Sequence, residues 1–331
     1  MLRVCNFAAL QSHKKVERLK VYHNLTEFTA AKVINPVMTT GTFDGVHLGH
    51  RVIIDRLNLE AKAIKGESVL LTFFPHPRMV LFPDDHGLQL LNSLDEKLAL
   101  LKAAGIEHVI VQPFTKEFSK LSALAYVKEI LVNSIGVKKM VVGYDHHFGN
   151  HREGNFDLLK EYALLYEFEV AEIPVQELNE VNVSSTKVRN ALLAGDVSLA
   201  NSFLSSNYQL GGVVKKGKQL GATIGFPTAN IMPINDYKLI PAVGVYAVKV
   251  TWANETYNGM MNIGHNPTVE NNSHLQLEVH ILDFQQNIYG ESITVTFFDR
   301  IRNEQKFDTL EALQQQLHHD KIQTLEMLQH T

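Results

Sequence analysis

Apolar residues follow two different patterns along this chain of 331 residues. Up to about residue 200, short runs rich in β-branched residues alternate with longer segments in which apolar residues recur every three or four positions. Such runs predict buried strands, and the wider spacing predicts amphipathic helices. Strands are expected at residues 36–40, 69–74, 109–111, 139–143 and 170–173. Helices are expected around residues 52–64 and at 94–104, 123–135, 156–166 and 185–193. Repeated strand–helix units predict a parallel sheet with helices on both faces.

From about residue 205 the pattern changes to strands separated by turns. The candidate strands are residues 208–214, 245–252, 257–263, 275–282 and 293–298. A helix closes the chain, and its apolar side is expected to carry Leu310, Leu313, Leu317, Ile322, Leu325 and Leu328. Several strands, glycine turns and one terminal helix predict a small closed or half-closed antiparallel barrel.

These patterns predict an α/β Rossmann-like domain at residues 25–204 and a small antiparallel β-barrel domain with a C-terminal helix at residues 205–331. No glycine- or proline-rich linker separates the halves, so we expect a short connection that docks them together. Residues 1–24 are a separate N-terminal extension. Basic residues outnumber acids there, which is compatible with a transit peptide, but a short ordered or frayed extension is the preferred interpretation because no cleavage site is evident.

Composition excludes some classes of function. A formal charge of −4 gives no electrostatic reason to expect a nucleic-acid partner. The only cysteine, Cys5, excludes an internal disulfide framework and fits a cytoplasmic protein. No run approaches the roughly 18 apolar residues that a membrane span needs. Nothing in the sequence indicates an oligomeric state.

The segment Gly41-Thr-Phe43-Asp44-Gly45-Val-His47-Leu-Gly49-His50 lies where a predicted strand gives way to a helix. Two histidines three residues apart share a helix face and can reach the same ligand atom. A helix N-terminus favours a phosphate, and the glycines allow the ligand to approach the backbone. An ordinary strand-to-helix turn is the alternative for an isolated pair of histidines, but this context favours a phosphate site.

Three further segments follow other predicted strands of the first half. Phe73-Phe-Pro-His76-Pro places a histidine between two rigid prolines. Residues 142–155 are rich in histidine, but they lack zinc-like spacings, so a ligand-lining loop is favoured over a metal site. Residues 184–189 contain hydroxyls that either cap a helix or contact a polyphosphate together with Lys187 or Arg189.

The first half resembles the nucleotidylyltransferase superfamily in its His-x-Gly-His and Ser-Ser-Thr-x-x-Arg motifs. Together with Phe-x-Pro-His-Pro, their order is similar to that in bacterial bifunctional riboflavin kinase/FAD synthetases. The resemblance implies transfer of AMP from ATP to FMN with release of pyrophosphate, by positioning and charge stabilisation, with Mg²⁺ present. It implies catalytic roles for His47, His50 and Arg189. ATP would contact Gly41, Phe43, Asp44, Gly45, Gly49, Ser184, Ser185 and Thr186. The flavin would contact Phe73, His76, Asp145 and Phe148.

One position departs from that family. Its members usually have Phe-Arg-Phe-Gly where this chain has His146-His147-Phe148-Gly149. A histidine thus replaces the arginine and is mostly neutral at pH 7 unless its pKa is raised.

The second half carries closely spaced glycines and lysines between residues 211 and 225. Glycines let backbone N–H groups line a phosphate, although the order is not that of a Walker loop, and a glycine-rich hairpin is the plain alternative. The following Pro-Thr-Ala-Asn resembles the riboflavin kinase signature. This resemblance implies Mg²⁺ and phosphate contacts from Thr228 and Asn230 and a general base at Glu278. It implies ATP contacts from Gly212, Lys218, Gly221 and Gly225, and flavin contacts from Asn262 and Arg302.

Two departures concern this second activity. The family usually has arginine where this chain has Ala222, and often has arginine where it has Asn266. Losing a fixed cation beside transferring phosphates lowers transition-state stabilisation. The main hypothesis is therefore an FAD synthetase with a riboflavin kinase domain, acting on ATP, FMN and riboflavin. The alternatives are a monofunctional adenylyltransferase with a degenerate kinase module and a flavin-binding regulator without turnover.

Overall fold

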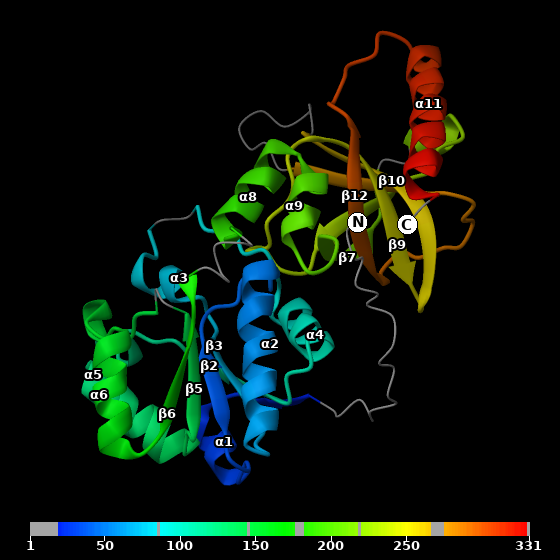
Figure 1. Ribbon diagram of the computed structural model, residues 1–331. Coiled ribbons are helices and arrows are strands. Elements are labelled where there is room, and N and C mark those ends of the chain that lie inside the picture. Colours follow the sequence, from blue (N-terminus) through cyan, green and yellow to red (C-terminus); the bar gives the residue numbers. More distant parts are fainter. Residues whose placement is uncertain are drawn as a thin grey trace, which may run out of the picture.

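A six-stranded parallel sheet forms the first half of the structure (Figure 1), a computed structural model that describes residues 19–84, 87–143, 146–175, 182–217, 220–265 and 275–329. The strand order is β1-β4-β3-β2-β5-β6. The strands are β1 (Lys20–Tyr22), β2 (Val37–Thr40), β3 (Ser68–Phe73), β4 (His108–Gln112), β5 (Lys139–Gly143) and β6 (Glu169–Ile173). The predicted Rossmann-like sheet is confirmed. Its edge strand β1 pairs with β4 and begins inside the stretch that we set apart as an extension.

Helices cover both faces of this sheet. On one face α2 (Leu48–Ala63) and α4 (Leu94–Ala103) share a core with the strands. On the other face lie α5 (Ala123–Ala125), the π-helical η2 (Tyr126–Ile135) and α6 (Phe156–Tyr166). The predicted helices are therefore present, although most of the segment 123–135 has π-helical hydrogen bonding. Two short helices, α1 (Leu25–Ala30) and α3 (Pro77–Leu81), were not predicted.

The second half is a closed antiparallel barrel with the order β10-β11-β8-β7-β12-β9. The strands are β7 (Gln209–Lys215), β8 (Ala229–Pro233), β9 (Gly244–Trp252), β10 (Glu255–His265), β11 (Leu275–Ile281) and β12 (Ser292–Arg302). The barrel prediction is confirmed, and the barrel is fully closed. Strand β8 escaped prediction because it is short, half-polar and ends at a proline, which resembles a loop.

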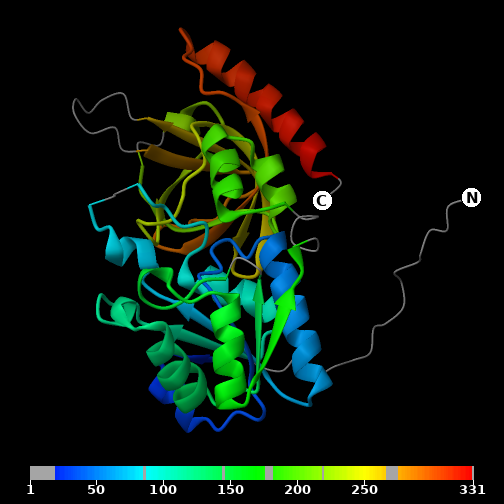
Figure 2. The same ribbon diagram turned by 60° about the vertical axis from the view of Figure 1, so that its left-hand side comes forward.

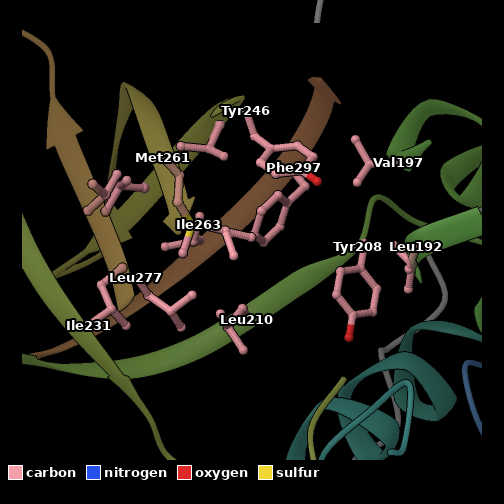
Figure 3. Close-up of a cluster of buried hydrophobic side chains, with 14 of the residues drawn as sticks. Leu192, Val197, Tyr208, Leu210, Ile231, Tyr246, Met261, Ile263, Leu277 and Phe297 are labelled. Carbon is pink, nitrogen blue, oxygen red and sulfur yellow. The ribbon is translucent and has the colours of Figure 1, made fainter. Parts of the chain in front are cut away.

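Apolar side chains fill the barrel interior, as Figure 3 shows for Met261, Ile263, Leu277 and Phe297. Two helices, α8 (Ser185–Ala194) and α9 (Val197–Phe203), pack on this same core through residues such as Leu192. Helix α9 was not predicted. The helical end of the first half and the barrel are therefore held together by one continuous hydrophobic cluster.

The C-terminal helix α11 (Leu310–Leu328) packs on the outer face of the barrel against β9, β10 and β12. Its buried positions include Asp320, Thr324 and Leu328. The predicted apolar side was wrong at Leu310 and Ile322, which are 63% and 56% exposed. The error at Ile322 arose because two polar residues, Asp320 and Thr324, occupy buried positions of the helix. A prediction from apolar residues alone treats such polar positions as exposed to solvent.

The barrel lies beyond the carboxyl ends of the parallel strands (Figures 1 and 2). The two halves touch there through a bridge between Leu90 and Lys238 and through a hydrogen bond that Ser205 Oγ donates to the Val46 carbonyl at 2.9 Å. Strand β2 lies between β3 and β5, so the chain changes direction across the sheet at β2. Ligands of open α/β sheets bind at such a switch point. Among the described residues, no helix is long and apolar enough to cross a bilayer.

Candidate active sites at the sheet edge and on the barrel

The loop after β2 is tightly turned at the switch point. Phe43 and Val46 adopt positive φ angles of 47° and 40°, which are uncommon for residues other than glycine. Gly45 has a φ of 89°, and a Cβ there would lie 2.7 Å from Leu91 Cδ1. Gly49 is also restricted, because its Cβ would lie 3.3 Å from the Val183 carbonyl oxygen. The glycines thus let the loop and α2 approach neighbouring segments closely.

His47 and His50 lie together at the start of α2. His47 is the N-cap residue, and its Nδ1 accepts a hydrogen bond from the His50 backbone N–H at 3.3 Å. This leaves the proton of a neutral His47 on Nε2. The two rings stack with centroids 3.7 Å apart, and Phe43 packs 4.9 Å from the His50 ring. The predicted pair therefore shares one face beside the positive end of the α2 dipole.

Both histidines are neutral at pH 7. Burial lowers the pKa of His47 to about 4. Burial, together with repulsion from His47 and Lys97, lowers the pKa of His50 well below its usual value. Within the described part of the chain, His50 Nδ1 is buried without a hydrogen-bond partner. A buried polar atom of this kind is costly unless a ligand or water satisfies it, so the pair is suited to donating hydrogen bonds to a phosphate.

A buried ion pair links the loop to α8. Arg189 donates to Asp44 Oδ2 at 2.8 Å and to the Gln89 carbonyl at 3.0 Å. Burial raises the pKa of the Asp44 carboxyl, and the charges of Arg189 and Lys97 oppose that shift. Ser185 Oγ donates to the Asp44 carbonyl at 2.9 Å. Two segments about 140 residues apart in the sequence therefore meet here.

The start of α8 separates the two alternatives left open for residues 184–189. Ser184 caps the helix by accepting from the Lys187 N–H, and Thr186 is exposed in the first turn. Lys187 Nζ donates to Asn182, whereas Arg189 points to Asp44. The segment therefore does cap the helix, and Arg189 is the cation that lies beside the β2 loop.

Lys97 is a residue of this site that sequence reasoning missed. It is 5% exposed, and its Nζ donates to the Thr42 carbonyl at 2.8 Å. Burial lowers its pKa to about 8, while Asp44 opposes the shift. The sequence could have revealed it, because Lys97 is four residues before Leu101 and therefore lies on the same buried side of α4. With Arg189, it supplies positive charge that the neutral histidines do not.

The predicted flavin residues lie along the same sheet edge. Phe73 packs 5.5 Å from the rings of Phe114 and Phe118. His76 caps α3, and burial together with Lys97, Arg189 and Arg78 lowers its pKa to about 4. Asp145 lies outside the described residues.

Phe148 is more deeply buried than the other predicted flavin residues that are described. It is 6% exposed and packs against Tyr126 and Gly154, so most of its ring belongs to the core. The neighbouring His147, which stands where the family has arginine, donates to the Gly154 carbonyl at 3.2 Å. This histidine thus closes the loop on itself.

The barrel carries a second candidate site on its outer face. A cavity of about 420 Å³ lies between the barrel and α11. Its lining includes Gly221, Thr228, Asn262, Glu278 and Arg302, all of them predicted site residues. It also includes Leu310, Leu313 and Leu317 of α11. The structure therefore collects residues from five separate parts of the second half.

Strand pairing aligns three of the polar residues in one row. Glu278 on β11 is opposite Asn262 on β10 and opposite Asn230 on β8. Leu277 and Val279 are buried in the barrel interior, so strand alternation places Glu278 on the outer face. Glu278 accepts from the Thr228 hydroxyl at 3.4 Å and from Gln276 Nε2 at 2.5 Å.

Sequence reasoning missed Gln276 and His280, the outward neighbours of Glu278. Gln276 also donates to Asn230 Oδ1 at 3.0 Å, so it ties two predicted residues together. His280 hydrogen-bonds the Pro227 carbonyl at 2.7 Å, and burial lowers its pKa. The available signal was the alternation of polar residues at 276, 278 and 280.

Arg302 holds the terminal helix over this cavity. Its guanidinium donates to both carboxylate oxygens of Asp320, with contacts of 3.0 and 2.8 Å. Asp320 is fully buried, so the pair depends on both partners. Arg302 was predicted from sequence as a flavin residue, while its partner Asp320 was missed.

The glycine-rich segment is shaped by close contacts. A Cβ at Gly217 would lie 1.9 Å from Asn230 Nδ2, and one at Gly221 would lie 2.2 Å from the Phe226 carbonyl oxygen. Gly225 needs its positive φ of 85°. Gly212 instead lies within β7, where a Cβ would meet Ile231 at 2.2 Å. Lys218 and Asn266 lie outside the described residues.

These two sites define a class of protein. One site, of the nucleotidyltransferase type, lies at the switch point of the parallel sheet, and the other is a barrel cavity that contains a carboxylate. The family model described as FAD synthetase matches residues 30–187, and the one described as riboflavin kinase matches residues 204–328. The chain belongs to the family of bifunctional riboflavin kinase/FMN adenylyltransferases, which confirms the resemblance drawn from the motifs.

Individual relatives match along most of their length. A bifunctional riboflavin kinase/FMN adenylyltransferase of Listeria monocytogenes is 40% identical over 88% of this chain and 92% of that protein. A protein of the same description from Escherichia coli is 38% identical over 91% and 94%. A solved structure described as a macrolide-efflux protein from Streptococcus pneumoniae has a TM-score of 0.82 at 31% identity, covering 92% of this chain and 97% of that one. This likeness concerns the fold, and efflux is named for that protein alone.

Proposed function

We propose that this chain is a bifunctional enzyme that makes FMN from riboflavin and FAD from FMN, using ATP in both reactions. The observation that supports the proposal is that one chain carries two groups of candidate site residues. At the sheet edge these are His47 and His50 with the Asp44–Arg189 ion pair, and on the barrel they are Glu278 and Thr228. Matches to both family models support the same conclusion.

In adenylyl transfer, a phosphate oxygen of FMN attacks the α-phosphorus of ATP. The new P–O bond forms as the bond to the β-phosphate breaks, and pyrophosphate leaves with the electron pair. His47 and His50 donate hydrogen bonds to the phosphates, and the α2 N-terminus adds backbone N–H groups. Arg189 and Lys97 supply positive charge next to the loop. No protein nucleophile is needed, because positioning and charge stabilisation carry the reaction.

In riboflavin phosphorylation, the 5′-hydroxyl of the ribityl chain attacks the γ-phosphorus of ATP, and ADP leaves. Glu278 takes the hydroxyl proton as general base. Asn262 and Arg302 line the cavity with Glu278 and would contact the flavin, and the backbone around Gly221 and Gly225 would contact the nucleotide.

Mg²⁺ is proposed as the metal of both reactions, where it neutralises phosphate charge when bound. On the barrel, the Thr228 hydroxyl and the Asn230 amide oxygen lie close together, because Thr228 contacts Glu278, and Gln276 links Glu278 to Asn230. Mg²⁺ prefers such hard oxygen donors, few protein ligands and substrate phosphates. These residues therefore fit the ion.

The remaining assignments are also proposals. At the sheet edge, Phe73, His76, Asp145 and Phe148 would contact the flavin, and the ATP-contacting residues would be those of the loop after β2 and the start of α8. Domain limits of 25–204 and 205–331 stay a prediction, although β1 adds residues 20–22 to the sheet of the first domain. The cytoplasm is the proposed compartment because both reactions consume ATP.

A substrate titration tests the two activities separately. The purified chain is given Mg-ATP with riboflavin alone or with FMN alone, and FMN, FAD and pyrophosphate are quantified. The proposal expects FMN and then FAD from riboflavin, and FAD with equimolar pyrophosphate from FMN. Conversion of FMN but not riboflavin would identify a monofunctional adenylyltransferase. Flavin binding without either product would identify a regulator without turnover.

A further inference from the structure

A lysine of the barrel half is buried against the first half. Lys238 lies between β8 and β9 and is 3% exposed. Its Nζ donates to Glu96 Oε2 and to the Leu91 carbonyl, both at 2.6 Å, and lies 4.3 Å from the Tyr208 ring centroid. The neighbouring backbone pairs too, since Leu90 N–H donates to the Tyr237 carbonyl at 2.7 Å. Lys238 thus fixes residues 90–91 from the barrel side.

The same short segment holds the transfer site from its other side. The backbone N–H groups of Leu91 and Asn92 donate to Asp44 Oδ1 at 2.9 and 3.4 Å. Asp44 Oδ2 accepts from Arg189, and Arg189 also donates to the Gln89 carbonyl. Residues 89–92 therefore connect the Lys238 ammonium to the Arg189 guanidinium through one carboxylate and three peptide groups.

Lys238 anchors Leu91 from the barrel, next to the backbone hydrogen bonds that Leu90 forms with Tyr237 and Leu239. A cavity of about 420 Å³ lies beside it and is lined by Gly45, Asn92 and Tyr208 among others, so Asn92 borders open space although Leu91 is fully buried. Burial lowers the pKa of Lys238, and Glu96 opposes the shift. A buried ion pair of this kind adds little net stability compared with an apolar pair, but it fixes geometry.

We propose that Lys238 is a positioning residue for adenylyl transfer: by holding residues 89–92 it orients Asp44 and, through Asp44, the Arg189 guanidinium at the phosphates. The inference rests on the proposed adenylyltransferase function. It means that the barrel, which carries the kinase cavity, also completes the geometry of the other active site. Helix α4 takes part on both sides, because Glu96 faces Lys238 while the adjacent Lys97 faces Thr42.

The experiment compares both activities within one full-length chain. Lys238→Met removes the ammonium but keeps an apolar stem, and Lys249→Met is the matched loss of a barrel lysine that lies over the Phe298 ring. We expect Lys238→Met to lower kcat for FAD formation at least about tenfold, while kcat for FMN formation stays within about twofold. Lys249→Met is expected to leave both unchanged. Retained FMN formation shows that the barrel bearing the substitution is folded.

A double-mutant cycle tests whether Lys238 acts by positioning Arg189 or only by stabilising the fold. If Lys238 acts through Asp44 and Arg189, Lys238→Met has little further effect on kcat once Arg189→Met is present. Unchanged FAD formation, a parallel loss of both activities, or independent effects in the double variant would each overturn the inference. Should Lys238→Met not fold, Glu96→Gln removes the partner charge and is judged by the same two rates. A wild-type chain that makes no FAD would instead overturn the proposed function.

Discussion

The two candidate sites are built in different ways. At the sheet edge, a ten-residue loop and helix start bring Asp44, His47 and His50 together, and one further helix adds Arg189. On the barrel, Glu278 gains its neighbours by strand pairing, and the cavity is closed by a helix that ends the chain. The first site is therefore mostly local in sequence, whereas the second exists only when the barrel and α11 assemble. A substitution in one site should therefore lower one activity and leave the other unchanged.

Removing both histidines should give the largest effect and isolate the local site. Each lost donor beside developing phosphate charge costs about 10²–10³-fold, so we expect His47→Ala with His50→Ala to lower kcat for FAD formation about 10⁴-fold. FMN formation should stay near wild type. His319→Ala, an exposed histidine of α11, is the control. A folded double variant with normal FAD formation would refute the assigned role of the pair.

Glu278→Gln should give the converse separation. Loss of a general base costs roughly 10²–10⁴-fold, so FMN formation should fall about 10³-fold while FAD formation from FMN persists. Glu291→Gln changes an exposed carboxylate just before β12 and should leave both rates unchanged. Both products are measured by chromatography. Normal riboflavin phosphorylation by Glu278→Gln would remove this residue from the reaction.

Asp320→Asn tests whether assembly creates the second site. It leaves Arg302 without its carboxylate in a buried position, which should lower the free energy of unfolding by about 3 kcal/mol. Riboflavin phosphorylation should weaken because α11 borders the cavity, and adenylyl transfer should not. Urea denaturation and both rates are compared with Glu326→Gln on the exposed side of α11. An equal loss of both activities would mean that the two sites are less separable than the structure indicates.

Acid should destabilise the local site through His47. Its folded pKa of about 4 lies below the usual 6.5, so the unfolded chain binds a proton that the folded chain excludes between these pH values. The stabilising contribution of His47 is present above pH 6.5 and should fall by about 2 kcal/mol on reaching pH 5. Urea midpoints at pH 7 and pH 5 measure the loss. His47→Gln should reduce that pH dependence, and an undiminished slope would contradict the assignment.

The smallest effect concerns the departure at Ala222. This residue is exposed on α10 (Leu220–Thr223), next to Gly221 at the cavity. Ala222→Arg restores a cation beside the transferring phosphate and should raise kcat for FMN formation about tenfold. Ala222→Gln is the uncharged control. FAD formation should not respond, and an equal gain with glutamine would show that charge is not the cause.

Sequence patterns were sufficient for elements with strong local signals. The five longer parallel strands, the helices between them and the barrel were predicted because their apolar periods are regular. The structure also contains elements that were missed because they are short or half-polar, namely β1, β8, α1, α3 and α9. Among site residues, Lys97 and Asp320 were missed for one shared reason: a hydrophobic pattern treats a charged residue as exposed, and only a buried partner explains its burial.

By itself, the sequence determined the fold class, the family and the local chemistry of residues 41–50, because a strand end, glycines and a helix start are close in the chain. Only the tertiary structure decided which distant groups meet that loop: Arg189 rather than Lys187, Lys97 from α4, and a barrel lysine behind them. The same holds for the row of Asn230, Glu278 and Asn262, since strand register sets it. The physical reason is that burial and pairing of charges depend on long-range packing, which no local pattern encodes.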